Sequence, residues 1–173
     1  MTASPFRRLA VIGVLAASSF ALAAAAPTFG PPWISIETPP NPFDATSRGA
    51  FLVVHTYHHG EVVASGVSGS AEGTVSGSRR TIPLVFDTTT RRGSYALRKQ
   101  WPTEGTWMLV INTGGRAQGV TALVDISSQG DVAGVRVPTR RSSDGWDLPQ
   151  QVTARDIDAA LETRVSRALS TRQ

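Results

Sequence analysis

The sequence predicts an all-β protein, an antiparallel β-sandwich of about seven or eight strands with an amphipathic helix at its C-terminal end. Short segments that alternate apolar and polar residues recur at regular spacing between residues 33 and 137. A Gly, Pro, Asn or Ser turn signal separates each segment from the next, as is typical of a sandwich. No connection among these segments has a helical pattern, which argues against a parallel sheet with crossover helices.

The expected strands follow from this period of two. They lie at residues 33–38, 50–57, 81–87, 94–100, 107–111, 120–126 and 132–137. Residues 61–77 are interrupted by Gly and Ser, so we expect a bulged strand there. Pro83 cannot donate a ladder hydrogen bond, and we therefore expect its strand at the edge of a sheet.

The stretch from Arg92 to Ile111, RGSYALRKQWPTEGTWMLVI, is the most regular of the chain. Alternation on both sides of Pro102–Gly105 predicts an antiparallel hairpin. Its second strand is apolar on both faces, with Trp107, Leu109 and Ile111 on one and Met108 and Val110 on the other. Such a strand is expected at the centre of a sheet that is covered on both sides. Trp101 flanks the turn and is expected to contribute less to the core than Trp107.

The tail changes character after residue 137. Residues 138–152 are polar and are interpreted as a linker, and residues 153–170 are expected to form a helix. Thr153 and Asp156 approximate a capping box at its start. The helix has one apolar stripe, which consists of Ile157, Ala160, Leu161, Val165, Ala168 and Leu169. The pattern leaves open whether this stripe docks on its own sandwich, on a second copy or on a partner.

The N-terminus has the features of a secretory signal peptide, predicted over residues 1–23. Arg7 and Arg8 precede an uncharged apolar run from Leu9 to Ala23, and small residues follow. The run has 15 residues, fewer than the roughly 20 that a spanning helix needs. We therefore expect an exported protein, periplasmic or extracellular, without an integral membrane segment after cleavage. Residues 24–32 are a proline-rich lead-in.

The composition excludes several classes of exported protein. With no cysteine, the chain has neither disulfides nor a lipid-anchoring cysteine, and it lacks the thiolate of a blue-copper site. Removing the signal peptide lowers the net charge to about +2, and the high isoelectric point arises because Lys99 is the only cation that is not Arg. We expect no nucleic-acid partner. About 150 mature residues suit one domain with its own core.

All three histidines lie in one short segment, His55, His58 and His59. Imidazoles that converge could bind copper or zinc. In an extended strand, however, His55 and His59 lie about 13 Å apart on one face and His58 points to the other. One ion could gather all three only if the chain folds back at His59–Gly60. Metal binding is therefore the alternative hypothesis for this segment, and a structural cluster at a strand end is the favoured one.

No pattern indicates a nucleophile motif, a phosphate loop or a pair of catalytic carboxylates, so we expect a protein that is not an enzyme and has no cofactor. Trp107 is expected in the core. Trp33, Trp101 and Trp146 lie at strand ends or in a loop, where a partly exposed indole could bind a partner.

The residues Gly93, Tyr95, Leu97, Trp101, Pro102, Gly105, Trp107, Leu109 and Ile111 form the pattern G-x-Y-x-L…W-P-x-x-G-x-W-x-L-x-I. This pattern resembles exported bacterial Ig-like domains of the YtkA-like and carboxypeptidase-regulatory-like kinds. The resemblance covers residues 50–126 and implies an Ig-like sandwich over residues 33–137, without an assured activity. The leading hypothesis is a non-catalytic binding or structural module of the cell envelope, with another envelope protein as its partner. The alternative is a periplasmic metal-binding accessory protein.

Overall fold

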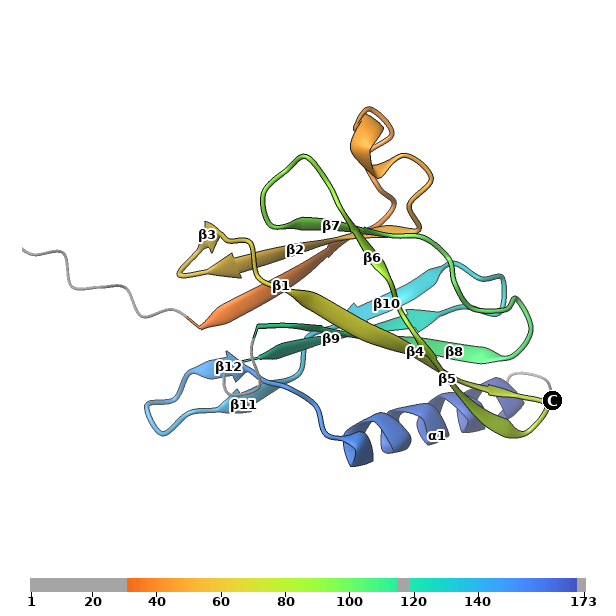
Figure 1. Ribbon diagram of the computed structural model, residues 1–173. Coiled ribbons are helices and arrows are strands. Elements are labelled where there is room, and N and C mark those ends of the chain that lie inside the picture. Colours follow the sequence, from red (N-terminus) through yellow and green to blue (C-terminus); the bar gives the residue numbers. More distant parts are fainter. Residues whose placement is uncertain (1–30, 115–118, 171–173) are drawn as a thin grey trace, which may run out of the picture.

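The computed structural model describes residues 31–114 and 119–170, so the predicted signal peptide and most of the lead-in lie outside the described residues. These residues form two five-stranded antiparallel sheets, one small two-stranded sheet and one α-helix. Figure 1 shows three layers, with one large sheet above the other and the helix beneath the lower sheet. The predicted all-β fold with a C-terminal helix is thus confirmed.

The upper sheet, called sheet A, has the order β1-β2-β7-β6, and β3 pairs with the end of β2 beyond β7. Its strands are β1 (Pro32–Glu37), β2 (Leu52–His58), β3 (Glu61–Val62), β6 (Phe86–Thr88) and β7 (Ser94–Leu97). The lower sheet, called sheet B, has the order β10-β9-β8-β4-β5. Its strands are β4 (Val67–Val75), β5 (Ser78–Pro83), β8 (Thr106–Thr113), β9 (Val120–Ile126) and β10 (Val132–Arg136).

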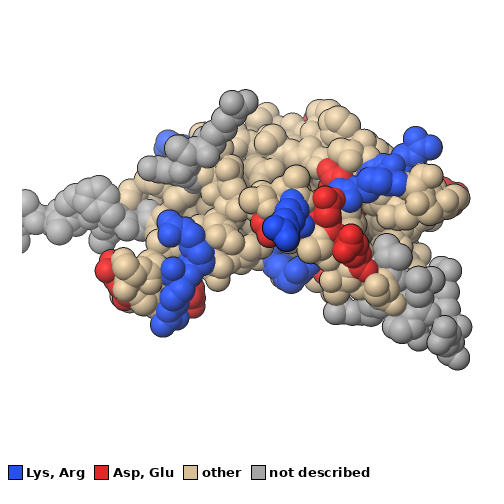
Figure 2. Space-filling view, turned by 90° about the horizontal axis from the view of Figure 1, so that it is seen from below, with Lys and Arg blue, Asp and Glu red and all other residues tan. Residues whose placement is uncertain are grey.

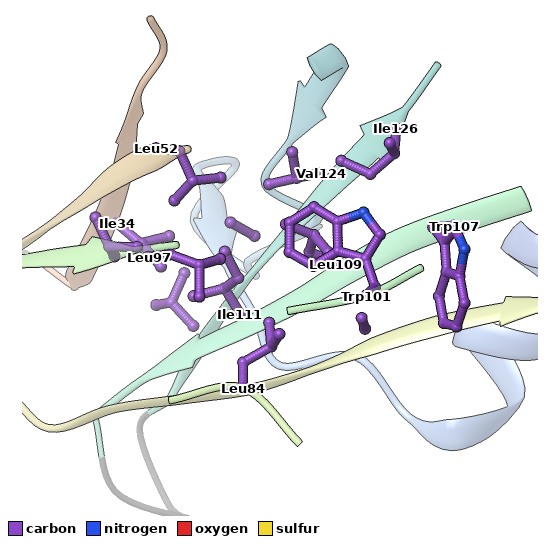
Figure 3. Close-up of a cluster of buried hydrophobic side chains, with 14 residues drawn as sticks. Ile34, Leu52, Leu84, Leu97, Trp101, Trp107, Leu109, Ile111, Val124 and Ile126 are labelled. Atoms are coloured by element: carbon purple, nitrogen blue, oxygen red, sulfur yellow. The ribbon is translucent and has the colours of Figure 1, made fainter. Parts of the chain in front are cut away.

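The main core lies between the two sheets, where alternate residues of each strand meet (Figure 3). Ile34 and Leu52 of sheet A face Leu109 and Ile111 of sheet B, and all four are fully buried. Trp107 is also buried in this cluster, as its position on an apolar strand predicts. Its indole Nε1 donates a hydrogen bond to the Glu104 carbonyl oxygen at 2.8 Å, so burial leaves no unpaired donor.

The predicted hairpin at residues 92–111 is wrong. β7 pairs with β2 and β6 in sheet A, whereas β8 pairs with β4 and β9 in sheet B. The segment between them therefore crosses from one sheet to the other. Trp101, in this crossing, is only 4% exposed and packs edge-on against Phe51 with ring centroids 5.0 Å apart. Alternation of apolar residues is the same in a hairpin and in an intersheet crossing, which is why the sequence did not separate them.

The predicted strand at residues 81–87 is also divided between the sheets. β5 ends at Pro83 on the edge of sheet B, and β6 begins at Phe86 on the edge of sheet A. The edge position that Pro83 predicts is confirmed. Leu84 is buried at the crossing, so apolar residues continue through the break and conceal it in the sequence. Residues 61–77 form β3 and the long strand β4, which lies between β8 and the edge strand β5.

The segment expected as a linker, residues 138–152, contains a small hairpin of β11 (Thr139–Arg141) and β12 (Asp147–Pro149). A turn at Ser142–Gly145 joins them, with the Ser142 N–H bonded to the Trp146 carbonyl oxygen. The two short strands, Thr-Arg-Arg and Asp-Leu-Pro, have no apolar alternation, and this is why the sequence predicted no strand here.

Helix α1 (Ala154–Ser170) begins with the predicted cap, in which the Thr153 N–H donates to Asp156 Oδ2 at 2.9 Å. Leu161 packs with Met108, Val110 and Leu123 on the outer face of sheet B, flanked by Ile157 and Ala160. The described part of the stripe therefore docks on its own sandwich, and β8 is covered on both faces as predicted. The side chains of Val165, Ala168 and Leu169 lie outside those that the structure describes.

Two charged connections hold the helix in place. Arg79 of β5 bonds to Glu72 of β4 at 2.9 Å and to Asp158 of the helix at 2.8 Å. On the other side, Arg164 of the helix pairs with Asp125 of β9 at 2.8 Å. Figure 2, viewed from the helix side, shows basic and acidic side chains interleaved rather than a surface of one sign.

Candidate functional site

The outer faces of the two sheets differ. Helix α1 covers the outer face of sheet B, whereas the outer face of sheet A carries no α-helix in the described residues. Because Ile34 of β1 and Val54 of β2 point into the core, their neighbours Trp33, His55 and Tyr57 point outward. Two groups of side chains lie on this outer face. One is a row of apolar residues and the other is a cluster of polar residues.

The exposed row consists of Trp33 and Val62, which are exposed, and Tyr57 between them, which is half-buried. Trp33 lies opposite Tyr57, and Tyr57 lies opposite Val62 on its other side, so the row crosses β1, β2 and β3 in register. Trp33 is 42% exposed and Val62 is equally so. Opposed side chains on one face of antiparallel strands lie about 5 Å apart at Cβ. The row is therefore one contiguous apolar strip at the β3 end of sheet A.

At the other end of sheet A, residues 38–50 leave β1, form the 3₁₀ turn η1 (Ala45–Ser47) and return to β2. This segment is called the strap, and Figure 1 shows it rising over that end of the sheet. Val53 and Ala96 point outward like His55, yet both are almost completely buried. A hydrogen bond from Arg98 to the Arg48 carbonyl oxygen joins the strap to β7's end. Sheet A is thus covered near the strap and open near the row.

A polar cluster lies between the strap and the row. His55 is opposite Ser94 on β7, and its Nδ1 is 2.9 Å from Ser94 Oγ. On its other side, His55 Nε2 is 2.8 Å from Glu37 Oε2 at the end of β1. A carboxylate accepts only, so Nε2 donates to Glu37, and in the neutral ring Nδ1 accepts from Ser94. Three strands are therefore connected through one imidazole.

The same cluster holds the strap. Arg91, in the turn before β7, bonds to Glu37 at 3.3 Å and to Asp44 of the strap at 3.0 Å. Glu37 Oε1 also accepts the Asn41 N–H at 2.7 Å. Burial raises the pKa of Glu37, but the hydrogen bonds from Asn41, His55 and Arg91 outweigh it, so the pKa lies below its ordinary value. Glu37 is therefore an anion at neutral pH.

The order Ser94, His55 and Glu37 is that of an acyl-transfer triad, but its geometry favours a structural role. Ser94 lies within a regular strand and is almost completely buried, whereas a nucleophile must meet a substrate. The serine also contacts Nδ1 and the acid contacts Nε2, the reverse of the serine-protease arrangement. The cluster thus connects β1, β2, β7 and the strap. It lies next to the exposed row and holds β1 and β2, two strands of the row, together.

The structure does not bring the three histidines together as a metal site. His55 is held by Glu37 and Ser94, while His58 and His59 stack edge-on with ring centroids 4.0 Å apart. The chain does fold back at His59–Gly60, where both residues have positive φ, as a two-residue hairpin turn requires. Among residues 31–114 and 119–170, no three His, Asp or Glu side chains form a group that could hold an ion.

The three tryptophans proposed as contacts have different environments. Trp33 belongs to the exposed row, and Trp146 is 73% exposed beside the β11–β12 turn. Trp101 is buried, so the expectation that it is partly exposed is wrong. The reason is the crossing between the sheets, which carries Trp101 through the core instead of around the end of a hairpin.

Sequence reasoning missed Glu37 and Ser94 as partners of His55 and Arg91 as a partner of Glu37. It also missed Tyr57 and Val62 as neighbours of Trp33. The cluster residues come from separate segments, and no spacing along the chain indicates that they meet. The row could have been found by pairing the strands at residues 33–38 and 50–57, since both alternate with an aromatic residue on the outward face.

Comparison with known proteins gives no relative for this chain: no family model, no curated protein and no solved structure matches it. Its class is therefore the one that the fold defines, a two-sheet antiparallel sandwich with a docked C-terminal helix. Among the helices of the described residues, none has the length and hydropathy needed to cross a membrane.

Proposed function

We propose that this protein is a non-catalytic, exported binding module of the cell envelope, and that it binds another envelope protein through the exposed row. The observation that carries the proposal is the register of Trp33, Tyr57 and Val62 across three strands at the open end of the outer face of sheet A. Export rests on the signal-peptide pattern of the first 23 residues.

The row has the composition of a protein-binding surface. Trp and Tyr are enriched at interface positions that carry most of the binding energy, because they bury a large area with few rotatable bonds. The strands beneath the row are fixed by the core on one side and by the polar cluster at its border. A partner therefore meets a surface that is already ordered, which lowers the entropic cost of binding.

Trp146 is a weaker candidate for the same role. It is exposed, but within the described residues its neighbours in the hairpin turn are Ser142, Ser143, Asp144 and Gly145 rather than other large apolar residues. Single exposed apolar side chains are common on protein surfaces. A contiguous group such as the row is less common and is a stronger indication of an interface.

Metal binding, the alternative function, has less support from the geometry. His55 makes two hydrogen bonds that an ion would have to replace, and the ring pair of His58 and His59 comes with no third ligand in the described residues. Zinc in proteins takes three or four protein ligands.

Site-specific photo-crosslinking tests the proposed interface. A photoreactive amino acid replaces Trp33 in one variant and Glu162 in another, and both variants are produced and exported in cells. Glu162 is exposed on helix α1, on the opposite side of the sandwich. We expect a discrete crosslinked protein from position 33 and none from position 162. Equal crosslinking from both positions, or none from position 33, would refute the proposed face.

A further inference from the structure

The strap presents an apolar side chain that its own chain leaves unburied. Phe43 is 94% exposed, more than any other large apolar side chain that the structure describes. A phenylalanine buries about 150–250 Å² when it enters a core or an interface. A single exposed apolar side chain is common on protein surfaces, so the exposure of Phe43 alone does not indicate an anchor. Its backbone and a hollow at the base of the same segment do.

The backbone around Phe43 is held in place. The Phe43 N–H donates to Asn41 Oδ1 at 3.0 Å, and the Asp44 N–H donates to the Asn41 carbonyl oxygen at 3.1 Å. Asp44 in turn accepts from the Thr46 N–H and pairs with Arg91. Asn41, which bonds to Glu37, and Asp44, which pairs with Arg91, therefore connect the segment around the phenylalanine to the sheet. An anchor that is ordered before binding loses little conformational entropy when it binds.

A cavity lies at the base of the same strap. It is a hollow open to solvent rather than an enclosed pocket, and its volume is about 400 Å³. It is lined by Thr38, Pro39, Ala50, Phe51, Asp131 and Val132. The two ends of the strap thus form one wall, and the start of β10 forms the other. Phe43 does not fill this cavity in its own chain, because its side chain is in solvent.

We propose that Phe43 enters this cavity in a second copy of the protein, so that two copies form a weak two-fold dimer. The anchor and the cavity belong to one strap, so a single two-fold axis makes both contacts at once. The charges agree with this pairing. Arg48 on the strap and Asp131 at the cavity are both exposed, and neither side chain makes an ion pair within the described residues.

The surface area buried between the two copies sets the expected affinity of the dimer. Two buried phenylalanines remove about 300–500 Å² from water, whereas a stable interface buries roughly 1,200 Å² or more. The contact is therefore a concentration-dependent association of the exported protein, not a permanent dimer. It is independent of the exposed row, and its failure leaves the proposed function untouched.

Sedimentation velocity over about 1 µM to 1 mM tests the association. The wild-type protein is expected to shift from monomer towards dimer across this range, and Phe43→Ala to remain monomeric. Trp146→Ala, which removes another exposed aromatic residue, is the matched control and should associate like the wild type. A wild-type protein that is monomeric throughout would overturn the proposal, and so would a Phe43→Ala variant that still associates. If a different protein occupied the cavity, the wild-type protein alone would also remain monomeric throughout, and the proposed dimer would be overturned.

Cysteine pairing tests the position of the anchor, since the natural chain has no cysteine. Pro42→Cys and Ala50→Cys proteins, both of which keep Phe43, are mixed under mild oxidation and compared with a mixture of Pro42→Cys and Glu162→Cys. The proposal predicts that the first mixture forms a mixed disulfide at least about tenfold faster. Equal rates in the two mixtures would contradict the assignment of the cavity.

Discussion

Gly73 of β4 lies directly against the ring of Trp107. A Cβ added at Gly73 would be 2.4 Å from Cε3 of the indole and 2.7 Å from the Thr106 carbonyl oxygen. The two residues are opposite each other in the β4–β8 pairing. The indole therefore occupies the space that a side chain on β4 would take, and the glycine is required by packing rather than by flexibility.

Gly73→Ala is expected to destabilise the fold by about 1–3 kcal/mol, the usual cost of overpacking a core. Neither the buried indole nor the strand backbone has space to move. Gly66→Ala is the control, because a Cβ there meets nothing within 4 Å. Urea unfolding measures both, and a Gly73→Ala protein as stable as Gly66→Ala would contradict the packing.

Trp107→Ala is expected to cost roughly 3–5 kcal/mol. For a chain of this length that lowers the melting temperature by at least about 6 °C. Trp101→Ala should have a comparable effect, because Trp101 is also buried. Thermal melts decide this. A Trp107→Ala melting temperature within about 2 °C of the parent would show that the indole is not a core residue.

The stability of the fold should fall in acid through Glu72. Burial raises the pKa of Glu72, but hydrogen bonds from Ser70, Thr81 and Arg79 lower it by more than burial raises it. The pKa in the folded protein is therefore below the ordinary 4.5. A carboxyl group whose pKa is lowered by folding stabilises the folded protein fully at a pH above its pKa in the unfolded chain. This stabilisation is lost as the pH falls through its pKa in the folded protein. We expect the melting temperature to be level above about pH 4.5 and to fall below it.

Replacing Glu72 by Gln should make that acid dependence smaller, since the group that takes up the proton is gone. Glu162→Gln, at an exposed position, should keep the parent's profile. Melts from pH 7 to pH 3 compare the three proteins. Parallel profiles for the parent and Glu72→Gln would show that Glu72 is not responsible.

Copper(II) and zinc(II) are expected to bind weakly at best, because His55 is held apart from the ring pair of His58 and His59. Calorimetric titration of the exported protein measures this. Tight one-to-one binding that disappears in His58→Ala would instead support the metal-binding alternative.

Export should remove the first 23 residues or so, leaving a mature protein that begins at Ala24 or Ala26. Intact-mass measurement of the exported protein gives this directly. A protein that still begins at Met1 outside the cytoplasm would refute the signal-peptide prediction.

The layers of the fold were predictable from the sequence because period-two alternation marks each strand and the 3.6-residue stripe marks the helix. The pairing of the strands could not be predicted, because alternation does not indicate which sheet a strand joins. The segments at Leu84 and Trp101 both cross between sheets with buried apolar residues, so the pattern continues where the strand ends. An eight-residue connection between β7 and β8 was the available sign that residues 94–111 are not a tight hairpin.

The candidate site was less predictable than the fold. Trp33 was recognised as a possible contact, since a large residue at a strand end is often exposed. The network around His55 could not be inferred, because Glu37, Arg91 and Ser94 meet it only through the order of strands in sheet A. The three histidines of one short segment suggested a shared role, but the structure holds His55 apart from the ring pair of His58 and His59.

The most direct test of the proposed function is the retention of envelope proteins on immobilised exported protein, compared between the wild type, Trp33→Ala and Trp146→Ala. The account predicts that the wild type and Trp146→Ala retain the same protein and that Trp33→Ala retains at least about tenfold less while its melting temperature is unchanged. Retention that is unaffected by Trp33→Ala, or that disappears only in Trp146→Ala, would contradict the assignment of the exposed row as the binding face.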